Sequence, residues 1–194
     1  GPIQWAIING ETETGITTML MDEGMDTGAM LLQEAIPITA DDTAGSLSPR
    51  LAELGGRLLV ETIVRLKAGT LIPQPQDSSQ ATLAPLLKKE DGVIDWALPA
   101  TVLANRVRGL SPWPGAYTTV AGSDRWTIWR ALALPSSVTS PPGVVVAITN
   151  EAIHVATGEG VLAVMELQPA NSRRMDVSQY LAGHPILVGF QLGG

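Results

Sequence analysis

The chain has 194 residues, of which 45% are hydrophobic and 16% charged, so it can bury a core and lacks the composition of a disordered tail. Its net charge is −7, yet residues 1–70 hold ten acidic and four basic residues while residues 99–194 hold five and six, which predicts two functional halves. With no cysteine and two histidines, the sequence excludes disulfides and thiolate metal sites and argues against a histidine metal centre.

Two strands joined by a short loop are predicted near the start of the chain. Residues 16–21 and 29–36 are rich in apolar and β-branched side chains, which favours strands. The segment between them, residues 22–28, holds two glycines and two aspartates and predicts a tight connection, called here the 22–28 loop.

A helix is predicted next, because leucines recur at one face of a helical pattern at positions 47, 51, 54 and 58. Proline is tolerated in the first turn of a helix but not in its interior, so Pro49 predicts that the regular helix begins near Ser48. Gly69 predicts its end. The pattern then disappears, and the prolines and polar residues of 70–98 predict an extended linker.

The second half predicts a helix followed by short strands. A helix is expected over about 98–109 and is stopped by Ser111-Pro112-Trp113-Pro114-Gly115. Short β-rich runs separated by turns then favour a small barrel or sandwich. They are expected at 116–121, 125–133, 143–149, 152–156 and 161–167, with a short closing helix at 177–181.

Asp26 in the 22–28 loop has two interpretations from local sequence. An aspartate before Thr-Gly most often hydrogen-bonds its own turn, whereas a carboxylate on a loop between rigid strands also suits proton handling in catalysis. A calcium loop is disfavoured, because Gly24, Gly28 and Gln33 stand where oxygen ligands would be required.

Three pairs of basic residues are candidates for contacts with a nucleic acid. The ordinary alternative for each pair is a solvent-exposed face without a binding role. Lys88-Lys89 lie in the linker, Arg106 and Arg108 on the following helix, and Arg173-Arg174 in a late turn. Contacts from such pairs to phosphates would be independent of base sequence and sensitive to salt. Four tryptophans also fall in the second half, and packing is a commoner role for them than base stacking.

Several segments, taken together and in order, resemble the methionyl-tRNA formyltransferase family over essentially the whole chain. They include Met21-Asp22-Glu23-Gly24-Met25-Asp26-Thr27-Gly28, Pro37-Ile38-Thr39-Ala40-Asp41-Asp42-Thr43, Lys89-Glu90-Asp91-Gly92, Ile94-Asp95-Trp96, the run from Arg106 to Gly115, and Leu167-Gln168-Pro169-Ala170. Each motif alone is weak, and their shared order makes the resemblance specific.

The resemblance implies an α/β plus all-β protein. Residues 1–69 would be the C-terminal portion of a Rossmann-like formyltransferase domain, 70–98 a linker, and 99–194 an OB-like β-barrel that holds tRNA. The family's active site uses an Asn, a His and an Asp, and only the Asp has a match, at Asp26. We therefore expect this chain to lack an upstream N-terminal segment that completes the catalytic domain, and to be inactive alone.

The resemblance also implies the substrates. The family transfers a formyl group from 10-formyltetrahydrofolate to initiator methionyl-tRNA in translation initiation, without a metal. Met25, Thr27 and Gly28 would form one wall of the folate site, and Lys88, Lys89, Arg173 and Arg174 would contact tRNA. A lack of cysteine and of any apolar run near 18 residues fits a cytoplasmic protein without a membrane span.

Two alternatives remain open at this point. The first is another folate-dependent formyltransferase that acts on a different amine, such as a sugar nucleotide, although the C-terminal motifs argue against it. The second is a truncated, non-catalytic module that binds tRNA or another RNA.

Overall fold

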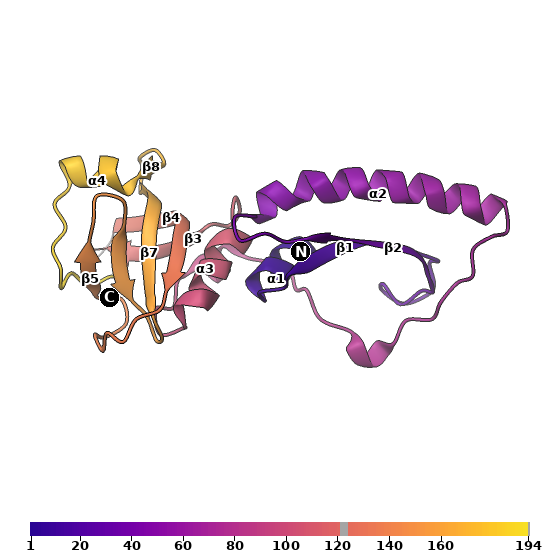
Figure 1. The fold of residues 1–194 in the computed structure, drawn as a ribbon, viewed down its shortest axis with the longest axis horizontal. Coiled ribbons are helices and arrows are strands. Elements are labelled where there is room, and N and C mark those ends of the chain that lie inside the picture. Colours follow the sequence, from indigo (N-terminus) through magenta and orange to yellow (C-terminus); the bar gives the residue numbers. More distant parts are fainter. Residues whose placement is uncertain (121–123, 194) are drawn as a thin grey trace.

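The N-terminal third of the chain pairs a two-stranded hairpin with a long helix. The computed structural model describes residues 1–120 and 124–193. Helix α1 (Pro2–Ile8) precedes the antiparallel strands β1 (Glu13–Met19) and β2 (Met30–Pro37), and helix α2 (Ala44–Lys67) follows. Figure 1 shows α2 lying along the hairpin, so this part has the predicted α/β character.

The leucine spacing correctly predicted the buried face of α2. Leu47, Leu51, Leu54 and Leu58 are all buried, and the first three form a small core with Ile7 and Ala44. Ile16 and Ile36 of the hairpin pack against that core. Burial of this stripe holds α2 on the hairpin, because each buried Leu contributes on the order of 1.5–3 kcal/mol.

The predicted start of α2 near Ser48 was wrong, since the helix begins at Ala44. Thr43 and Ser46 form a capping box: the amide of Ser46 donates to Thr43 Oγ1 at 3.1 Å, and the amide of Thr43 donates to Ser46 Oγ at 3.0 Å. This cap stabilises the first turn and sets its start. Pro49 therefore lies inside the helix, where the cap and the buried Leu47 offset the hydrogen bond that proline cannot donate.

The end of α2 agrees with the prediction. The helix stops at Lys67, and Gly69 adopts a φ of +67° just beyond it. Helix α1 was not predicted; it is seven residues long and begins at Pro2. Its Ile8 lies against Gly109, where a Cβ would come within 2.6 Å of Ile8 Cγ1.

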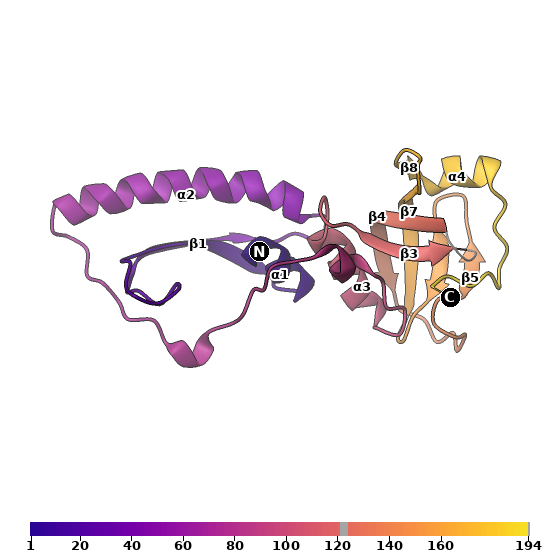
Figure 2. The ribbon, with the colours of Figure 1, turned by 180° about the vertical axis from the view of Figure 1, so that it is seen from behind.

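The linker leaves the far end of α2, passes under the hairpin and returns towards the second part (Figure 2). It contains two short 3-10 turns, Ser78–Gln80 and Lys89–Gly92. Gln74 forms an isolated bridge with Met30 at the start of β2, so the linker is anchored to the hairpin.

The second part holds a six-stranded sheet, and the two predicted helices precede and follow its strands along the chain. Helix α3 (Ala100–Gly109) precedes strands β3 (Ala116–Val120), β4 (Asp124–Leu134), β5 (Val145–Ile148), β6 (Ile153–Ala156), β7 (Val161–Pro169) and β8 (Met175–Asp176), and helix α4 (Val177–Gly183) follows. The paired strands follow the order β3-β4-β7-β6-β5, with β8 beside β7. The predicted strand 116–121 extends to Ala121, which lies outside the described residues.

The strand path is open within 1–120 and 124–193, so the OB-like barrel is not seen as a closed ring of strands. β3 and β5 lie at the two ends of the path. Between them, Leu192 forms an isolated bridge with Val120 and Gln191 forms one with Val144. The interior includes Trp126, Ile128, Leu162 and Leu167, each no more than 2% exposed.

The two parts are joined through Arg108 on α3. Its Nη1 donates to the backbone carbonyls of Thr39 and Asp42 at 3.1 and 2.9 Å, and its Nη2 donates to Asn105 Oδ1 at 2.8 Å. Burial lowers the pKa of the guanidinium. Arg108 therefore connects α3 to the segment that precedes α2.

Candidate functional site

The 22–28 loop is held by Asp22. Its Oδ1 accepts hydrogen bonds from the amide of Gly24 at 3.1 Å and from Thr27 Oγ1 at 2.7 Å. Asp22 is thus the aspartate that caps its own turn, as expected for this residue type.

Asp26 lies at the tip of the same loop with an exposed side chain and a φ of 56°. Its carboxylate makes no hydrogen bond or ion pair with residues 1–120 or 124–193, and its backbone carbonyl accepts from Gln76 Nε2 at 2.8 Å. The left-handed conformation costs about 1 kcal/mol for a residue with a Cβ, so the surrounding contacts must hold it. The neutral interpretation, a carboxylate that bonds its own turn, describes Asp22 rather than Asp26.

Gly28 ends the loop where the chain passes very close to itself. A Cβ at this position would lie 1.6 Å from the carbonyl oxygen of Leu20. The amide of Leu20 donates to the carbonyl of Ala29 at 2.9 Å, which closes the base of the loop. Only glycine permits this approach.

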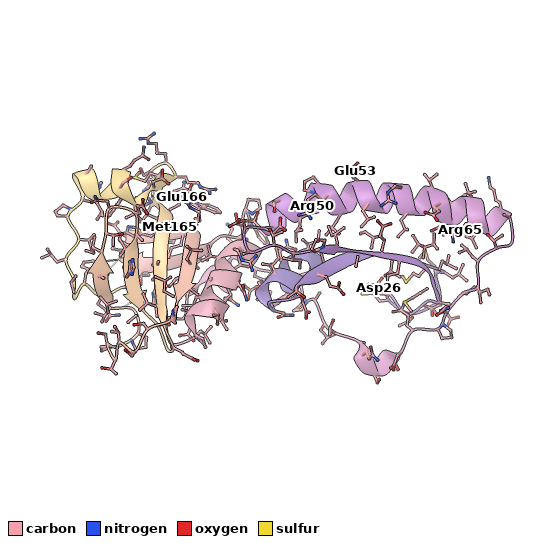
Figure 3. The ribbon with its side chains drawn as sticks, viewed as in Figure 1. Asp26, Arg50, Glu53, Arg65, Met165 and Glu166 are labelled. Atoms are coloured by element: carbon pink, nitrogen blue, oxygen red, sulfur yellow. The ribbon has the colours of Figure 1, made fainter. Side chains whose placement is uncertain are left out.

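A hollow of about 560 Å³ opens between the loop and the linker, and we call it the Asp26 hollow. Its lining comes from the hairpin and from the linker: Asp26, Thr27, Met30 and Gln33, and Pro75, Gln76, Asp77, Ser78, Gln80 and Ala81. Figure 3 shows Asp26 on the part of the hairpin away from the β-strands of the second part. The volume falls in the range of about 300–1,000 Å³ typical of small-molecule sites.

The linker side of the hollow was missed by sequence reasoning. Asp77 caps the turn at Ser78–Gln80, because its Oδ1 accepts from the amide of Ser79 at 3.0 Å and from Ser79 Oγ at 2.6 Å. Hydrogen bonds from Ser79 lower the pKa of Asp77. The Asp-Ser-Ser run is a capping signal, but nothing local in the sequence pairs Gln76 with a loop about fifty residues earlier.

The predicted folate residues divide between two positions. Thr27 lines the hollow, whereas Met25 is 90% exposed and does not line it. Gly28 lies at the base of the loop against the carbonyl of Leu20. The side-chain amides of Gln33, Gln76 and Gln80 sit beside the apolar Met30 and Pro75. Donors, acceptors and apolar walls together fit one side of a site for a polar heterocycle.

The predicted tRNA residues do not share one environment. Lys88 and Lys89 are exposed at the linker turn Lys89–Gly92. Arg173 is exposed, while Arg174 pairs with Glu166, and that hydrogen bond lowers the pKa of Glu166. No hydrogen bond or ion pair among the described residues joins the two basic pairs.

Neither a metal-binding cluster nor a membrane-spanning helix is found in the described part of the chain. No group of three or more His, Cys, Asp or Glu side chains within it could hold a metal ion. None of its helices has both the length and the apolar character that crossing a membrane requires.

Comparison with known proteins gives two family matches. A family model described as "Formyl transferase, C-terminal domain" matches residues 86–185, and one described as "Formyl transferase" matches residues 1–63. Curated relatives named methionyl-tRNA formyltransferase include those of Trichlorobacter lovleyi, 48% identical over 97% of this chain and 58% of the relative, and Caldanaerobacter subterraneus subsp. tengcongensis, 50% identical over 97% and 60%. The chain therefore spans about three fifths of the length of the relatives it matches.

Solved structures show the same fold at low identity. An N-formyltransferase from Helicobacter canadensis, solved with folinic acid and dTDP-3-aminofucose, matches with a TM-score of 0.66 at 17% identity over 89% of this chain and 60% of its own. HypX from Aquifex aeolicus, solved with tetrahydrofolic acid, matches with a TM-score of 0.62 at 20% identity over 92% of this chain and 32% of its own.

Proposed function

The chain belongs to the formyl transferase family, and we propose that it forms part of an enzyme that transfers a formyl group from 10-formyltetrahydrofolate to the amino group of initiator methionyl-tRNA. The names of the curated relatives support methionyl-tRNA as the acceptor, and solved structures of similar fold with tetrahydrofolic acid or folinic acid support a folate donor. Within the chain, one observation carries it. The carboxylate of Asp26, held at the edge of the Asp26 hollow, has no partner among the described residues.

Formyl transfer requires movement of a proton beside the reacting carbon. A bond forms between the amine nitrogen and the formyl carbon, the bond from that carbon to N10 of the folate breaks, and a proton passes from the amine towards N10. A positioned carboxylate contributes to such a transfer by accepting the proton or by orienting a histidine or water that carries it. We assign this role to Asp26, together with an Asn and a His that this chain does not match.

The Asp26 hollow supplies one wall for the folate. Thr27 faces it, and Gly28 and Met25 complete the loop that forms its rim. When bound, the folate supplies the formyl carbon and the N10 leaving group. The chain's own contribution is to place Asp26, with Gln76 holding the loop, and to present the side-chain amide of Gln33 to the ligand.

Contacts to tRNA would come from the second part and from the linker. We retain residues 1–69 as catalytic, 70–98 as linker and 99–194 as an OB-like domain, in which Gln191 and Leu192 span the gap between β3 and β5. In Figure 1 the hairpin and the strands of the second part lie at opposite ends of the molecule. Such a layout suits a large substrate whose amine enters at Asp26 while Lys88, Lys89, Arg173 and Arg174 meet its phosphates in the cytoplasm.

The substrate assignment is tested with a chimera. This chain would replace the 188 matched residues of the Trichlorobacter lovleyi protein, and formyl transfer from 10-formyltetrahydrofolate would be measured to methionyl-tRNA and to a dTDP-amino sugar. We expect transfer to methionyl-tRNA alone, and no transfer by the 194-residue chain. Transfer to the amino sugar would reassign the substrate class. An inactive but folded chimera that still binds tRNA would favour a non-catalytic RNA-binding module.

A further inference from the structure

We propose that the outer face of β4 is a stacking site for an unpaired RNA nucleotide, formed by Tyr117, Arg125, Trp129 and Arg174 and called here the aromatic–arginine surface. The inference rests on the proposed function, because it assigns the tRNA a contact with its bases in addition to its phosphates. Nothing in the 22–28 loop enters the argument.

The alternation of β4 places Arg125 and Trp129 on its outer face, and Tyr117 of β3 lies opposite Thr127 of β4. Trp126 and Ile128 point into the core and are 2% and 0% exposed, so Arg125, Thr127 and Trp129 face outwards. The register with β7 shifts between Ile128 and Arg130 and again between Arg130 and Ala131, so the alternation is interrupted after Trp129 and the next buried residue is Ala131. Irregularities of this kind re-aim a side chain. A hollow of about 250 Å³ lies between Arg125 and Trp129.

The orientation of the Trp129 ring is fixed by a hydrogen bond to a neighbouring strand. Its Nε1 donates to Gln168 Oε1 at 3.0 Å, and Gln168 Nε2 donates to the carbonyl of Ser172, also at 3.0 Å. The turn that carries Arg173 and Arg174 is thereby linked to the indole. A ring already held in place loses little conformational freedom when a ligand stacks on it, which favours binding.

Two arginines lie over aromatic rings on this face. The guanidinium carbon of Arg125 is 4.7 Å from the ring centre of Tyr117, and that of Arg174 is 5.3 Å from the ring centre of Trp129. Glu166 holds Arg174 from the side. Aromatic rings and guanidinium planes are the two groups on which proteins stack unpaired bases.

The charges around the surface suit a polyanion. All four arginines that follow residue 110 lie on β4 or in the turn before β8, namely Arg125, Arg130, Arg173 and Arg174. Three acids, Asp124, Glu166 and Asp176, lie among them, so the local balance is four positive to three negative charges. Of these four arginines, Arg130 and Arg174 form ion pairs within the described residues, which leaves Arg125 and Arg173 to meet phosphates.

The linker turn that carries Lys89 packs against the Tyr117 end of the same surface. A Cβ on Gly92 would lie 3.0 Å from the Tyr117 ring, and Val93 forms a bridge with Tyr117. The turn that begins at Lys89 is therefore packed beside the ring on which Arg125 lies. Basic residues thus flank the aromatic–arginine surface at the Tyr117 end and at the Trp129 end.

The volume of the hollow between Arg125 and Trp129 limits the size of the group that it can hold. At about 250 Å³ it is smaller than the roughly 300–1,000 Å³ of sites for drug-sized ligands, so a single flat group fits better than a cofactor. A tryptophan that served packing alone would be buried like Trp126, whereas Trp129 keeps part of its surface open.

The test uses the 194-residue chain and a fluorescein-labelled decamer of uridine, with binding measured by anisotropy across a salt series. Trp129→Leu should weaken binding by roughly five- to a hundred-fold, the range for loss of one base–aromatic stack, and Trp129→Phe should retain most of the affinity. Arg125→Gln should lower the salt slope by about one, since it removes one phosphate contact. Trp113→Leu is the matched control, because Trp113 is 51% exposed and does not line the hollow.

A second measurement covers the case in which Trp129→Leu fails to fold. Photo-crosslinking of the unchanged chain to an RNA that contains 4-thiouridine should give adducts within β4. Adducts confined to the linker lysines, or full affinity in a folded Trp129→Leu chain, would overturn the proposal. Binding of the uridine decamer and formyl transfer by the chimera are measured separately, so failure of the stacking site can be told apart from failure of the formyl-transfer assignment.

Discussion

The side-chain amide of Gln76 donates two hydrogen bonds of 2.8 Å, one to the carbonyl of Asp26 and one to the carbonyl of Gly28. Both amide hydrogens are used, so a linker residue fixes the backbone on either side of Thr27. The position of the Asp26 carboxylate at the hollow therefore depends on the linker as well as on the 22–28 loop.

Replacing Gln76 should impair catalysis without unfolding the protein. Gln76→Glu removes both donors and sets a carboxylate against two carbonyl oxygens, so we expect kcat/KM of the chimera to fall by about ten- to a hundred-fold through misplacement of Asp26. The melting temperature should change little, because the contact is largely exposed. Gln74→Ala is the control, because Gln74 bonds to Met30 through its backbone, which the substitution keeps. An unchanged kcat/KM in the Gln76→Glu enzyme would show that Gln76 does not position Asp26 for catalysis.

Gly28→Ala should disrupt the 22–28 loop. The new Cβ would meet the Leu20 carbonyl at 1.6 Å, so the loop must shift and carry Asp26 with it. We expect loss of most formyl-transfer activity. Gly56→Ala on α2 provides the opposite control, because nothing lies within 4 Å of its Cβ and a helical alanine gains about 1 kcal/mol over glycine. Equal melting temperatures and activities in both variants would contradict the geometry.

Asp42 should make stability depend on acid pH. Burial raises the pKa of this carboxyl, but hydrogen bonds from Thr39, Ser46 and Arg50 outweigh burial and lower the pKa to about 2. A folded pKa below the unfolded value of about 3.9 means that the stabilisation is present above pH 4 and is lost as pH falls from about 4 towards 2. Thermal melts of Asp42→Asn should therefore vary less over this range than those of the unchanged chain. Parallel curves would rule Asp42 out as the source.

Arg108→Met should loosen the junction between the two parts. It leaves the carbonyls of Thr39 and Asp42 without this donor, at a cost of roughly 1–3 kcal/mol. The denaturation midpoint should fall accordingly. Arg65→Met removes an exposed pair with Glu61 and should cost less than about 0.5 kcal/mol. Similar decreases in the free energy of unfolding for the two variants would show that Arg108 stabilises the junction no more than an exposed ion pair does.

The C-terminal half of α2 should make residues 1–69 the less protected part of the isolated chain. Leu59, Val60 and Val64 are 53%, 63% and 60% exposed, and contiguous apolar surface of this kind promotes association. Limited proteolysis should cut within 1–69 before it cuts the strands of the second part. Val60→Lys with Val64→Glu should reduce self-association in sedimentation experiments. Protection of 1–69 equal to that of the second part would contradict this expectation.

The elements that sequence predicted well are those fixed by local pattern. The leucine stripe of α2 and the β-rich run predicted at 125–133 depend only on the residues of one element, and the structure places both elements within a few residues of the prediction. The start of α2 was missed because the prediction assigned Pro49 to the first turn, whereas the Thr43–Ser46 cap starts the helix at Ala44. Gln76 was missed because its role arises only when a polar linker folds back on the 22–28 loop.

The measurement closest to the central claim is kcat/KM for formyl transfer to methionyl-tRNA by Asp26→Asn in the chimera. Glu23→Gln is the matched control, an exposed carboxylate of the same loop. If Asp26 handles the proton, its loss should lower kcat/KM by roughly 10²–10⁴-fold while Glu23→Gln stays near the unchanged enzyme. Equal, near-normal rates in both variants would show that the carboxylate at the Asp26 hollow is not catalytic.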